Sequence, residues 1–173
     1  MKSSIKIRQL VYLAILSSFV IVLGIIIKIQ TPVGIFTPMC DAGVFVTALF
    51  FGPSSGLVVG AFSGFLIDFL SGAYEWMFFS LIIHALQGFI VGWSLKKNFL
   101  SKRNSHVYHF ILGSLMMVAG YALSGNFLYG WTLSIAQVPN NIIQTGLGIV
   151  IAIIVENIIR KIFQKIRINK ELK

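Results

Sequence analysis

The sequence is short of both cysteine and charge. Its single cysteine, Cys40, excludes an internal disulfide framework. Charged residues make up 11% of the chain, whereas a soluble domain usually carries about 25%. The sequence also lacks a G-x-x-x-x-G-K-[ST] phosphate loop, so it cannot use ATP as an energy source through that motif. No paired nucleophile and base is evident, which argues against an intramembrane enzyme.

Long apolar stretches take the place of charge, and 57% of the residues are hydrophobic. A membrane-spanning helix needs roughly 20 apolar residues. Four stretches meet this length: Leu10–Ile29, Trp76–Leu95, Val107–Tyr129 and Pro139–Phe163. A further stretch, Gly43–Leu70, is too long for one span and short for two. The run GPSSG at residues 52–56 interrupts it, and glycine with proline marks a turn.

The basic residues predict the topology. Thirteen of the 14 Lys and Arg residues fall within residues 2–8, 96–103 and 160–173. Positive charge collects on cytoplasmic segments of membrane proteins. If residues 43–70 cross twice, all three clusters and both termini are cytoplasmic; a single crossing puts the first cluster opposite the other two. We therefore predict an all-α membrane protein, with residues 1–173 forming one compact bundle of six transmembrane helices. Charges that flank apolar spans do not indicate nucleic acid.

The second predicted helix is short. With Asp41 as its N-cap, it reaches Pro53 after about 12 residues, or about 18 Å, against a hydrocarbon core of about 30 Å. Such a helix must tilt, begin before Asp41, or be wrapped by neighbouring protein. The outward loops become Gln30–Cys40, Ser71–Glu75 and Trp131–Val138. The first of them is long and holds two prolines and a glycine, so we expect a folded cap or gate.

Small residues recur every four positions on two of the predicted spans. One set is the glycine stripe, Gly52, Gly56, Gly60 and Gly64. Small residues at this spacing let helices approach closely in lipid, so we expect the stripe to pack within the bundle. The other set is Ala14 and Ser18, on the first span. Two interpretations stay open for this pair: internal packing, or a docking groove for another membrane subunit.

Polar side chains gather in the predicted outer half of the bundle. They are Ser80, His84 and Gln87 on the fourth span, Asn126 and Tyr129 on the fifth, and Asn140, Asn141 and Gln144 on the sixth, with Trp76 at the same level. Polar residues within spans usually face a cavity or a partner. We therefore predict that these nine residues bind a substrate. The alternatives are an interhelical hydrogen bond for His84 and a place in the interfacial aromatic belt for Trp76.

The same outer half is poor in cations, since Lys28 alone is available there. A carboxylate ligand such as folate, biotin or pantothenate normally binds Arg or Lys. Amide, imidazole and aromatic groups instead suit a flat, neutral or weakly cationic heteroaromatic ligand. Asp41, Asp68 and Glu75 either assist a cation or only cap and solvate helix ends.

Two features at the predicted cytoplasmic end have simpler interpretations. His106 and His109 lie three residues apart but no third ligand is evident, so no metal site is expected. Glu156 and Arg160, four apart on one helix, are expected to form an ion pair.

These patterns resemble a known family, the substrate-binding S components of energy-coupling factor (ECF) vitamin transporters. The first shared feature is the run LFFGPSSG at residues 49–56, which continues through the glycine stripe to Asp68. Another is LIIHALQG at residues 81–88, followed by Gly92, and the third is the pair Ala14 and Ser18. The resemblance covers nearly the whole chain. It is strongest with the type that takes up hydroxymethylpyrimidine or vitamin B6; pantothenate, folate or another B vitamin is the alternative.

The resemblance implies a mechanism and partners. An S component binds its vitamin outside a bacterial cell membrane, topples on a transmembrane coupling subunit and releases the vitamin inside. Two separate ATPases, with ATP and Mg, supply the energy, so no cofactor is expected in this multi-pass chain and no enzymatic activity of its own. In the family, an Ala-xxx-Ala pair on the first span docks the coupling subunit. Here Ser18, or Ser17 if the register is shifted, replaces the second alanine and preserves its small size.

A self-sufficient carrier is the competing hypothesis. It would use His84 or Asp68 as a proton relay and need no ATPase. Few charges lie deep in the spans, and no inverted repeat is detectable in the sequence.

Overall fold

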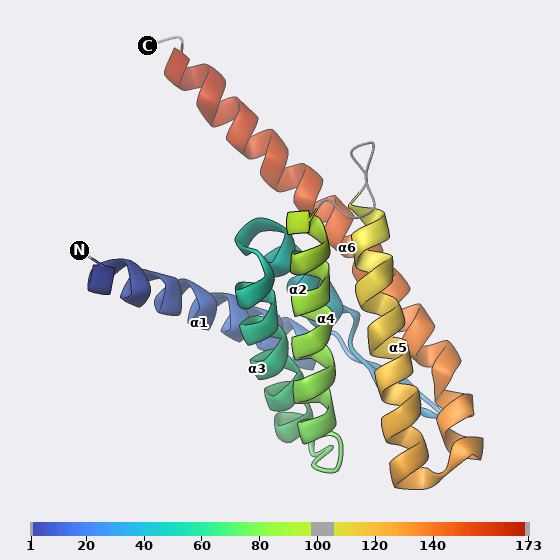
Figure 1. Ribbon diagram of the computed structural model, residues 1–173. Coiled ribbons are helices and arrows are strands. Elements are labelled where there is room, and N and C mark those ends of the chain that lie inside the picture. Colours follow the sequence, from blue (N-terminus) through green and yellow to red (C-terminus); the bar gives the residue numbers. More distant parts are fainter. Residues whose placement is uncertain (1, 98–105, 172–173) are drawn as a thin grey trace.

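The computed structural model describes residues 2–97 and 106–171 and shows an all-α bundle with one small hairpin. The elements are α1 (Lys2–Ile26), β1 (Ile29–Thr31), β2 (Gly34–Phe36), α2 (Pro38–Phe51), α3 (Pro53–Ser71), α4 (Met77–Lys97), α5 (Val107–Tyr129) and α6 (Trp131–Glu171) (Figure 1). The six predicted helices are confirmed. Lys102, Arg103 and Lys173 lie outside the described residues, as do the side chains of residues 2–6 and 166–171.

Five of the helices are long and apolar enough to cross a membrane, and α2 is the exception. Its 14 residues span about 21 Å at 1.5 Å per residue. Residues on several sides of α2 are buried, among them Val44 and Phe45 at 0% exposure. The short helix is therefore wrapped by neighbouring protein, which was one of the three predicted solutions. The orientation of the bundle in the membrane stays a prediction.

The start of α2 corrects the predicted role of Asp41. The helix begins at Pro38, because proline is well suited to a first turn. Thr37 occupies the N-cap position, without a side-chain cap bond, and Asp41 lies within the first turn. Its carboxylate is completely buried and bonds elsewhere, so the prediction that Asp41 caps this helix is wrong.

The predicted break between α2 and α3 is confirmed at Gly52. Its φ of 84° is one that L side chains rarely adopt, and its N–H bonds to the Ala48 carbonyl at 3.0 Å. Pro53 then begins α3, where its missing N–H costs nothing. Two antiparallel helices can follow each other here with almost no connecting chain.

Helices α3 and α4 lie side by side in backbone contact (Figure 1). A Cβ added at Gly56 would lie 2.6 Å from the Gly88 carbonyl oxygen, and one at Gly64 would lie 2.5 Å from the Ser80 carbonyl oxygen. Gly60 faces the His84 backbone in the same way. The prediction that the stripe packs within the bundle is confirmed. This contact between α3 and α4 also determines where the polar face of α4 lies along the bundle.

The junction between α5 and α6 differs from the prediction. Residues 131–138 were expected to form an outward loop, with the last span beginning at Pro139. Gly130, with φ 82°, alone separates the two helices, and α6 runs from Trp131 with Pro139 inside it. A proline within a helix removes one backbone bond, and membrane helices tolerate this when neighbouring groups compensate. The glycine, not the proline, therefore marks the turn.

The segment before α2 is folded, as expected for a cap. Strands β1 and β2 pair antiparallel, with Thr31 opposite Gly34. The Thr31 hydroxyl donates to the Gly34 carbonyl at 2.8 Å and accepts from the Asn140 side-chain amide of α6 at 2.6 Å. Phe36 is buried. The hairpin is thus fixed to the bundle at both ends.

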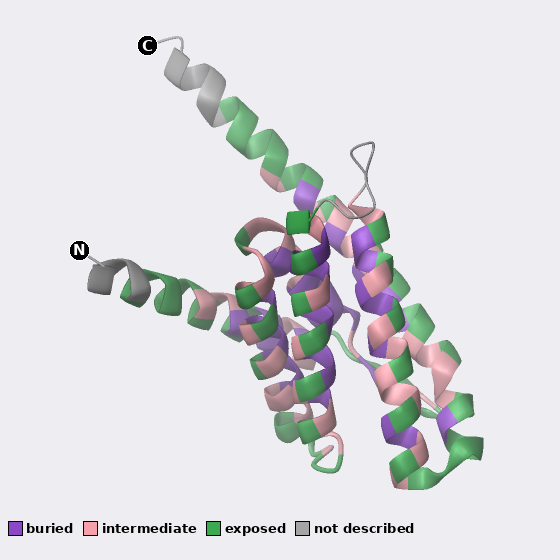
Figure 2. Cartoon of the chain, viewed as in Figure 1, coloured by how far each residue is buried: buried purple, intermediate pink, exposed green. Residues whose placement is uncertain are grey.

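The two halves of the bundle have different interiors. Toward the α2–α3 turn lies an apolar cluster in which Phe45 and Phe110 stack with ring centroids 5.0 Å apart. Buried residues concentrate where α2, α3 and α4 meet, while much of α1 is exposed (Figure 2). At the end beyond this cluster, the Arg160 Nε lies 2.8 Å from Glu156, which confirms the predicted ion pair, and His106 also bonds Glu156 at 2.6 Å.

Candidate functional site

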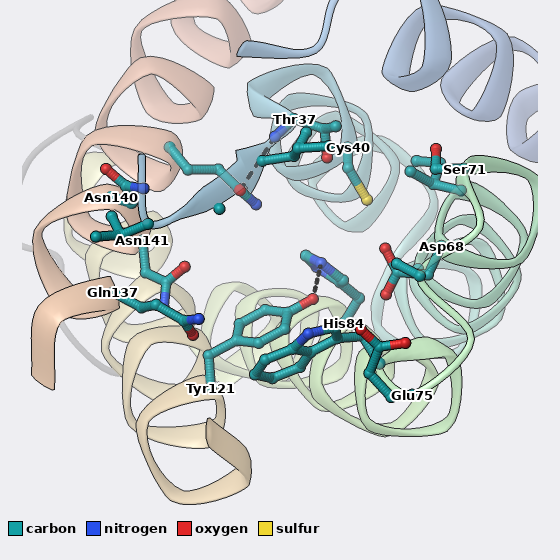
Figure 3. A pocket seen from close by; sticks show the side chains of 18 residues that line it. Thr37, Cys40, Asp68, Ser71, Glu75, His84, Tyr121, Gln137, Asn140 and Asn141 are labelled. Carbon is teal, nitrogen blue, oxygen red and sulfur yellow. Dashed lines mark hydrogen bonds between the residues drawn. The ribbon is translucent and has the colours of Figure 1, made fainter. Parts of the chain in front are cut away.

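A cavity of about 280 Å³ opens in the half of the bundle away from the apolar cluster. It lies among the hairpin, the α3–α4 loop and all helices except α1 (Figure 3). The lining residues are Val33, Gly34, Ile35, Thr37, Cys40, Gly64, Ile67, Asp68, Ser71, Ala73, Glu75, Trp76, His84, Tyr121, Gln137, Asn140, Asn141 and Gln144.

The cavity has two chemically different walls. Asp68 and Glu75 lie on one side of the space, and the amides Gln137, Asn140 and Asn141 lie on the other (Figure 3). No Lys or Arg is among the described residues that line it. Asp68 and Glu75 were expected either to assist a cation or only to cap and solvate helix ends. Both carboxylates face the cavity, so they are placed where they can contact a ligand.

Aromatic rings from the α3–α4 loop and from helices α4 and α5 meet beside these walls. The Trp76 and Tyr121 ring centroids are 5.7 Å apart with an interplanar angle of 52°. Tyr121 also lies edge-on to His84 at 5.8 Å. Indole and phenol faces at the edge of a cavity offer stacking surfaces to a flat ring. Trp76 thus lines the cavity, in addition to lying near the predicted membrane–water interface.

Five of the nine predicted substrate-binding residues line the cavity: Trp76, His84, Asn140, Asn141 and Gln144. Two others, Ser80 and Gln87, are buried and bond to lining residues instead. Asn126 is not among the lining residues. Tyr129 is exposed and reaches the site indirectly, donating to Glu75 at 3.2 Å.

His84 is 3% exposed and bonds on both ring nitrogens. Its Nδ1 lies 2.7 Å from Gln87 Oε1, and its Nε2 lies 3.2 Å from the Tyr121 hydroxyl of α5. That hydroxyl also lies 2.6 Å from Ser80 Oγ. The interhelical hydrogen bond and the cavity-facing role were posed as alternatives for His84, and the structure shows both.

The sequence reasoning missed Thr37, Cys40, Ser71, Tyr121 and Gln137. Tyr121 lies eight residues before Tyr129 on α5, so helical spacing would have found it. Gln137 was assigned to a loop, and without helical spacing its facing side was undetermined. The remaining three lie at helix ends, where the pattern of a single helix says little about what faces a cavity.

The pair Ala14 and Ser18 lies on the outside of α1. Both residues are exposed, whereas Ser17 is buried at 7% exposure. The Ser18 hydroxyl donates to the Ala14 carbonyl of its own helix at 2.8 Å. Large apolar side chains surround the pair on the same exposed surface, among them Ile15 and Val22. Ala14 and Ser18 are therefore not buried within the described chain.

Comparison with known proteins places this architecture in context. The sequence model of the family described as "ECF-type riboflavin transporter, S component" matches residues 4–161. A thiamine precursor transporter, HmpT, of Lactococcus lactis subsp. cremoris is 33% identical over 158 residues, which is 90% of each chain. An uncharacterized protein of Pyrococcus woesei is 32% identical over 111 residues, covering 64% of this chain and 73% of its own length.

Proposed function

Because the chain belongs to the family of S components of ECF-type transporters, we propose that its cavity binds a neutral or weakly cationic vitamin precursor with one heteroaromatic ring. Hydroxymethylpyrimidine is the leading candidate, and vitamin B6 follows it. The observation that carries this proposal is the composition of the cavity: two carboxylates, several amides, two aromatic rings and no Lys or Arg among its described lining residues.

The chemistry of each wall supports such a ligand. A pyrimidine that carries amino and hydroxymethyl groups has donors for Asp68 and Glu75 and acceptors for the amides Asn140 and Asn141. Its flat ring can stack on Trp76 or Tyr121. An acidic vitamin such as folate or pantothenate would place its carboxylate near these two acids without a cationic partner, which is unfavourable.

The size of the cavity favours a one-ring ligand over a larger one. Small-molecule sites usually measure about 300–1,000 Å³, and this cavity of about 280 Å³ lies just below that range. The family model that matches the chain is named for riboflavin, whose ring system has three fused rings. The relative HmpT is named for a thiamine precursor. A ligand of that kind is compatible with the composition of the cavity.

Family membership implies association with ECF coupling and ATPase modules. We propose that the partners are one transmembrane coupling subunit and two ATPases, which bind ATP and Mg. The exposed apolar face of α1 around Ala14 and Ser18 is the docking surface in this proposal. The chain would bind its vitamin outside, topple on the coupling subunit and release the vitamin inside.

A thermal-shift panel on the purified protein tests the ligand class. It should contain hydroxymethylpyrimidine, pyridoxine, riboflavin, pantothenate and folate. A ligand at about 100 times its dissociation constant stabilises a protein by roughly 2.7 kcal/mol. We expect stabilisation by hydroxymethylpyrimidine or pyridoxine, and a shift with the acidic vitamins alone would contradict the proposal.

Two cavity variants and a matched control locate the binding. His84→Ala and Asn141→Ala remove side chains that line the cavity, so vitamin affinity should fall about tenfold for each, the loss of one or two hydrogen bonds. Asn157→Ala changes an exposed asparagine on the same helix as Asn141 and should leave affinity unchanged. Unchanged affinity in both cavity variants would remove the two residues from the site. Proton-driven uptake by the chain alone would establish the competing carrier.

A further inference from the structure

A buried carboxylate that does not line the cavity bonds to Gln144, which does, and to Gln87, which lies behind the lining residue His84. Asp41 is 0% exposed in the first turn of α2. Its two oxygens accept hydrogen bonds from the side-chain amides of Gln87 on α4 and Gln144 on α6, each at 2.6 Å. A Cβ added at Gly148 would lie 2.6 Å from the Asp41 Cβ, so α6 passes close beside it.

The orientation of Gln144 is determined by the backbone. The Thr37 N–H lies 3.1 Å from Gln144 Oε1 (Figure 3). A backbone N–H only donates, so Gln144 must present its oxygen to Thr37 and its NH2 group to Asp41. Asp41 is thus an acceptor on this side, which suits an ionised carboxylate. The N-terminal end of α2 stabilises such a negative charge.

The orientation of Gln87 and the tautomer of His84 follow from the same charge. An ionised Asp41 requires the NH2 group of Gln87, which leaves Gln87 Oε1 facing His84 Nδ1 at 2.7 Å. The imidazole must therefore carry its proton on Nδ1. In the neutral imidazole, Nε2 is then an acceptor for the Tyr121 hydroxyl at 3.2 Å (Figure 3), and that phenolic oxygen in turn accepts from Ser80 at 2.6 Å.

We propose that Asp41 is a positioning residue for ligand recognition, because this one carboxylate determines which way the hydrogen-bonding groups of Gln87, His84 and Tyr121 point. With this arrangement, one N–H of Gln144 and one oxygen lone pair of Tyr121 remain beyond the hydrogen bonds described above. A ligand therefore meets a defined donor and a defined acceptor. The identity of that ligand rests on the proposed function, whereas the tautomer of His84 does not.

The isosteric variant Asp41→Asn reverses the arrangement. Asparagine offers one oxygen and one NH2 group, so one glutamine must rotate. Gln144 is held by the Thr37 N–H, so Gln87 rotates and turns its NH2 group toward His84. The imidazole then moves its proton to Nε2. Because the cavity now offers the wrong donor pattern, we expect vitamin affinity to fall at least about tenfold.

A double variant should restore the original pattern. In Asp41→Asn/Gln87→Glu, the asparagine NH2 group donates to the new carboxylate, which accepts from His84 Nδ1 as Gln87 did. Formal charge and side-chain sizes stay the same as in the wild type. The single variant Gln87→Glu instead places two carboxylates side by side, and like charges so close disfavour each other. A purely structural role of Asp41 does not predict rescue by moving its charge.

The experiment is 15N NMR of histidine-labelled, ligand-free protein, combined with vitamin affinity. The chain has three histidines, and the His84 signal is assigned by its absence in His84→Ala. We expect the Nδ1–H tautomer in the wild type, the Nε2–H tautomer in Asp41→Asn, and a return of tautomer and affinity in the double variant. Gln87→Met, which leaves Asp41 in place but breaks its link to His84, should show both tautomers.

Three results would overturn the proposal: the same His84 tautomer in wild type and Asp41→Asn, a fixed tautomer in Gln87→Met, or a restored tautomer without restored affinity. A wild type that binds none of the vitamins contradicts the proposed function instead, because the tautomer is measured without ligand. The two failures are therefore distinguishable.

Discussion

Helices α3 and α1 carry small residues at the same four-residue spacing but use them differently. The stripe residues Gly56, Gly60 and Gly64 face the backbone of α4. Ala14 and Ser18 are exposed on α1, and the Ser18 hydroxyl bonds to the Ala14 carbonyl of the same helix. Spacing shows that a helix has a smooth face. It does not show whether that face is covered by the same chain or by another one.

The difference has an energetic consequence. On α3 the space above each glycine is already filled by carbonyl groups of α4, so an added side chain must separate two helices. On α1 an added side chain meets only lipid or a partner. A substitution should therefore change stability on α3 and assembly on α1, and three predictions test this contrast.

The largest effect is expected for Gly60→Leu. The new side chain would collide with the His84 backbone, and overpacking of this kind costs about 3 kcal/mol or more when backbone must shift. Because α4 also carries cavity residues, vitamin binding should be lost together with thermal stability. Gly146→Leu is the control, since nothing lies within 4 Å of a Cβ at that exposed position. Equal stability of both variants would contradict backbone contact between α3 and α4.

A selective effect is expected for Ala14→Leu. Unfolding free energy should stay within about 0.5 kcal/mol of the wild type, as for most exposed substitutions, and vitamin affinity should not change. Co-purification with the coupling subunit and transport into proteoliposomes should both be lost, because the added side chain prevents close approach of helices. Ala119→Leu makes the same exposed change on α5 and should assemble normally. Undisturbed assembly of Ala14→Leu would refute the docking role.

The smallest effect is expected for Ser18→Ala. The Ser18 hydroxyl is bonded to the carbonyl of Ala14 in its own helix, so it has no need of a partner. Removing it keeps the residue small and should change uptake less than about twofold, within 0.4 kcal/mol. Transport rates of Ser18→Ala and Ser18→Leu, measured together, separate size from polarity. A large loss in the alanine variant would mean that the hydroxyl bonds to the partner.

Several parts of the fold were accessible from the sequence because they depend on local chemistry. The break at Gly52 and Pro53 follows from backbone geometry alone, and the glycine stripe follows from spacing. The error at residues 131–138 shows the limit of this reasoning. Pro139 is a strong local signal, yet tolerance of a proline within a helix depends on neighbouring groups that the sequence does not place.

The candidate site shows the same difference between features that depend on local sequence and features that depend on distant residues. Four predicted polar residues reach the cavity because helical spacing puts polar groups on one face, and Trp76 of the α3–α4 loop lines it with them. Asp41 was expected to cap a helix, and its burial between Gln87 and Gln144 depends on residues about 46 and 103 positions away. Such long-range partners leave no periodic trace in the sequence.

The sequence by itself determined the membrane class, the six helices and the scarcity of cations around the future cavity, because hydrophobicity, turns and charge act locally. Only the tertiary structure decided which small residues are covered, where α6 begins, and which polar groups face the cavity and which support it from behind. Those outcomes depend on the packing of helices against one another, and a carboxylate such as Asp41 acquires its bonding pattern only when three helices meet around it.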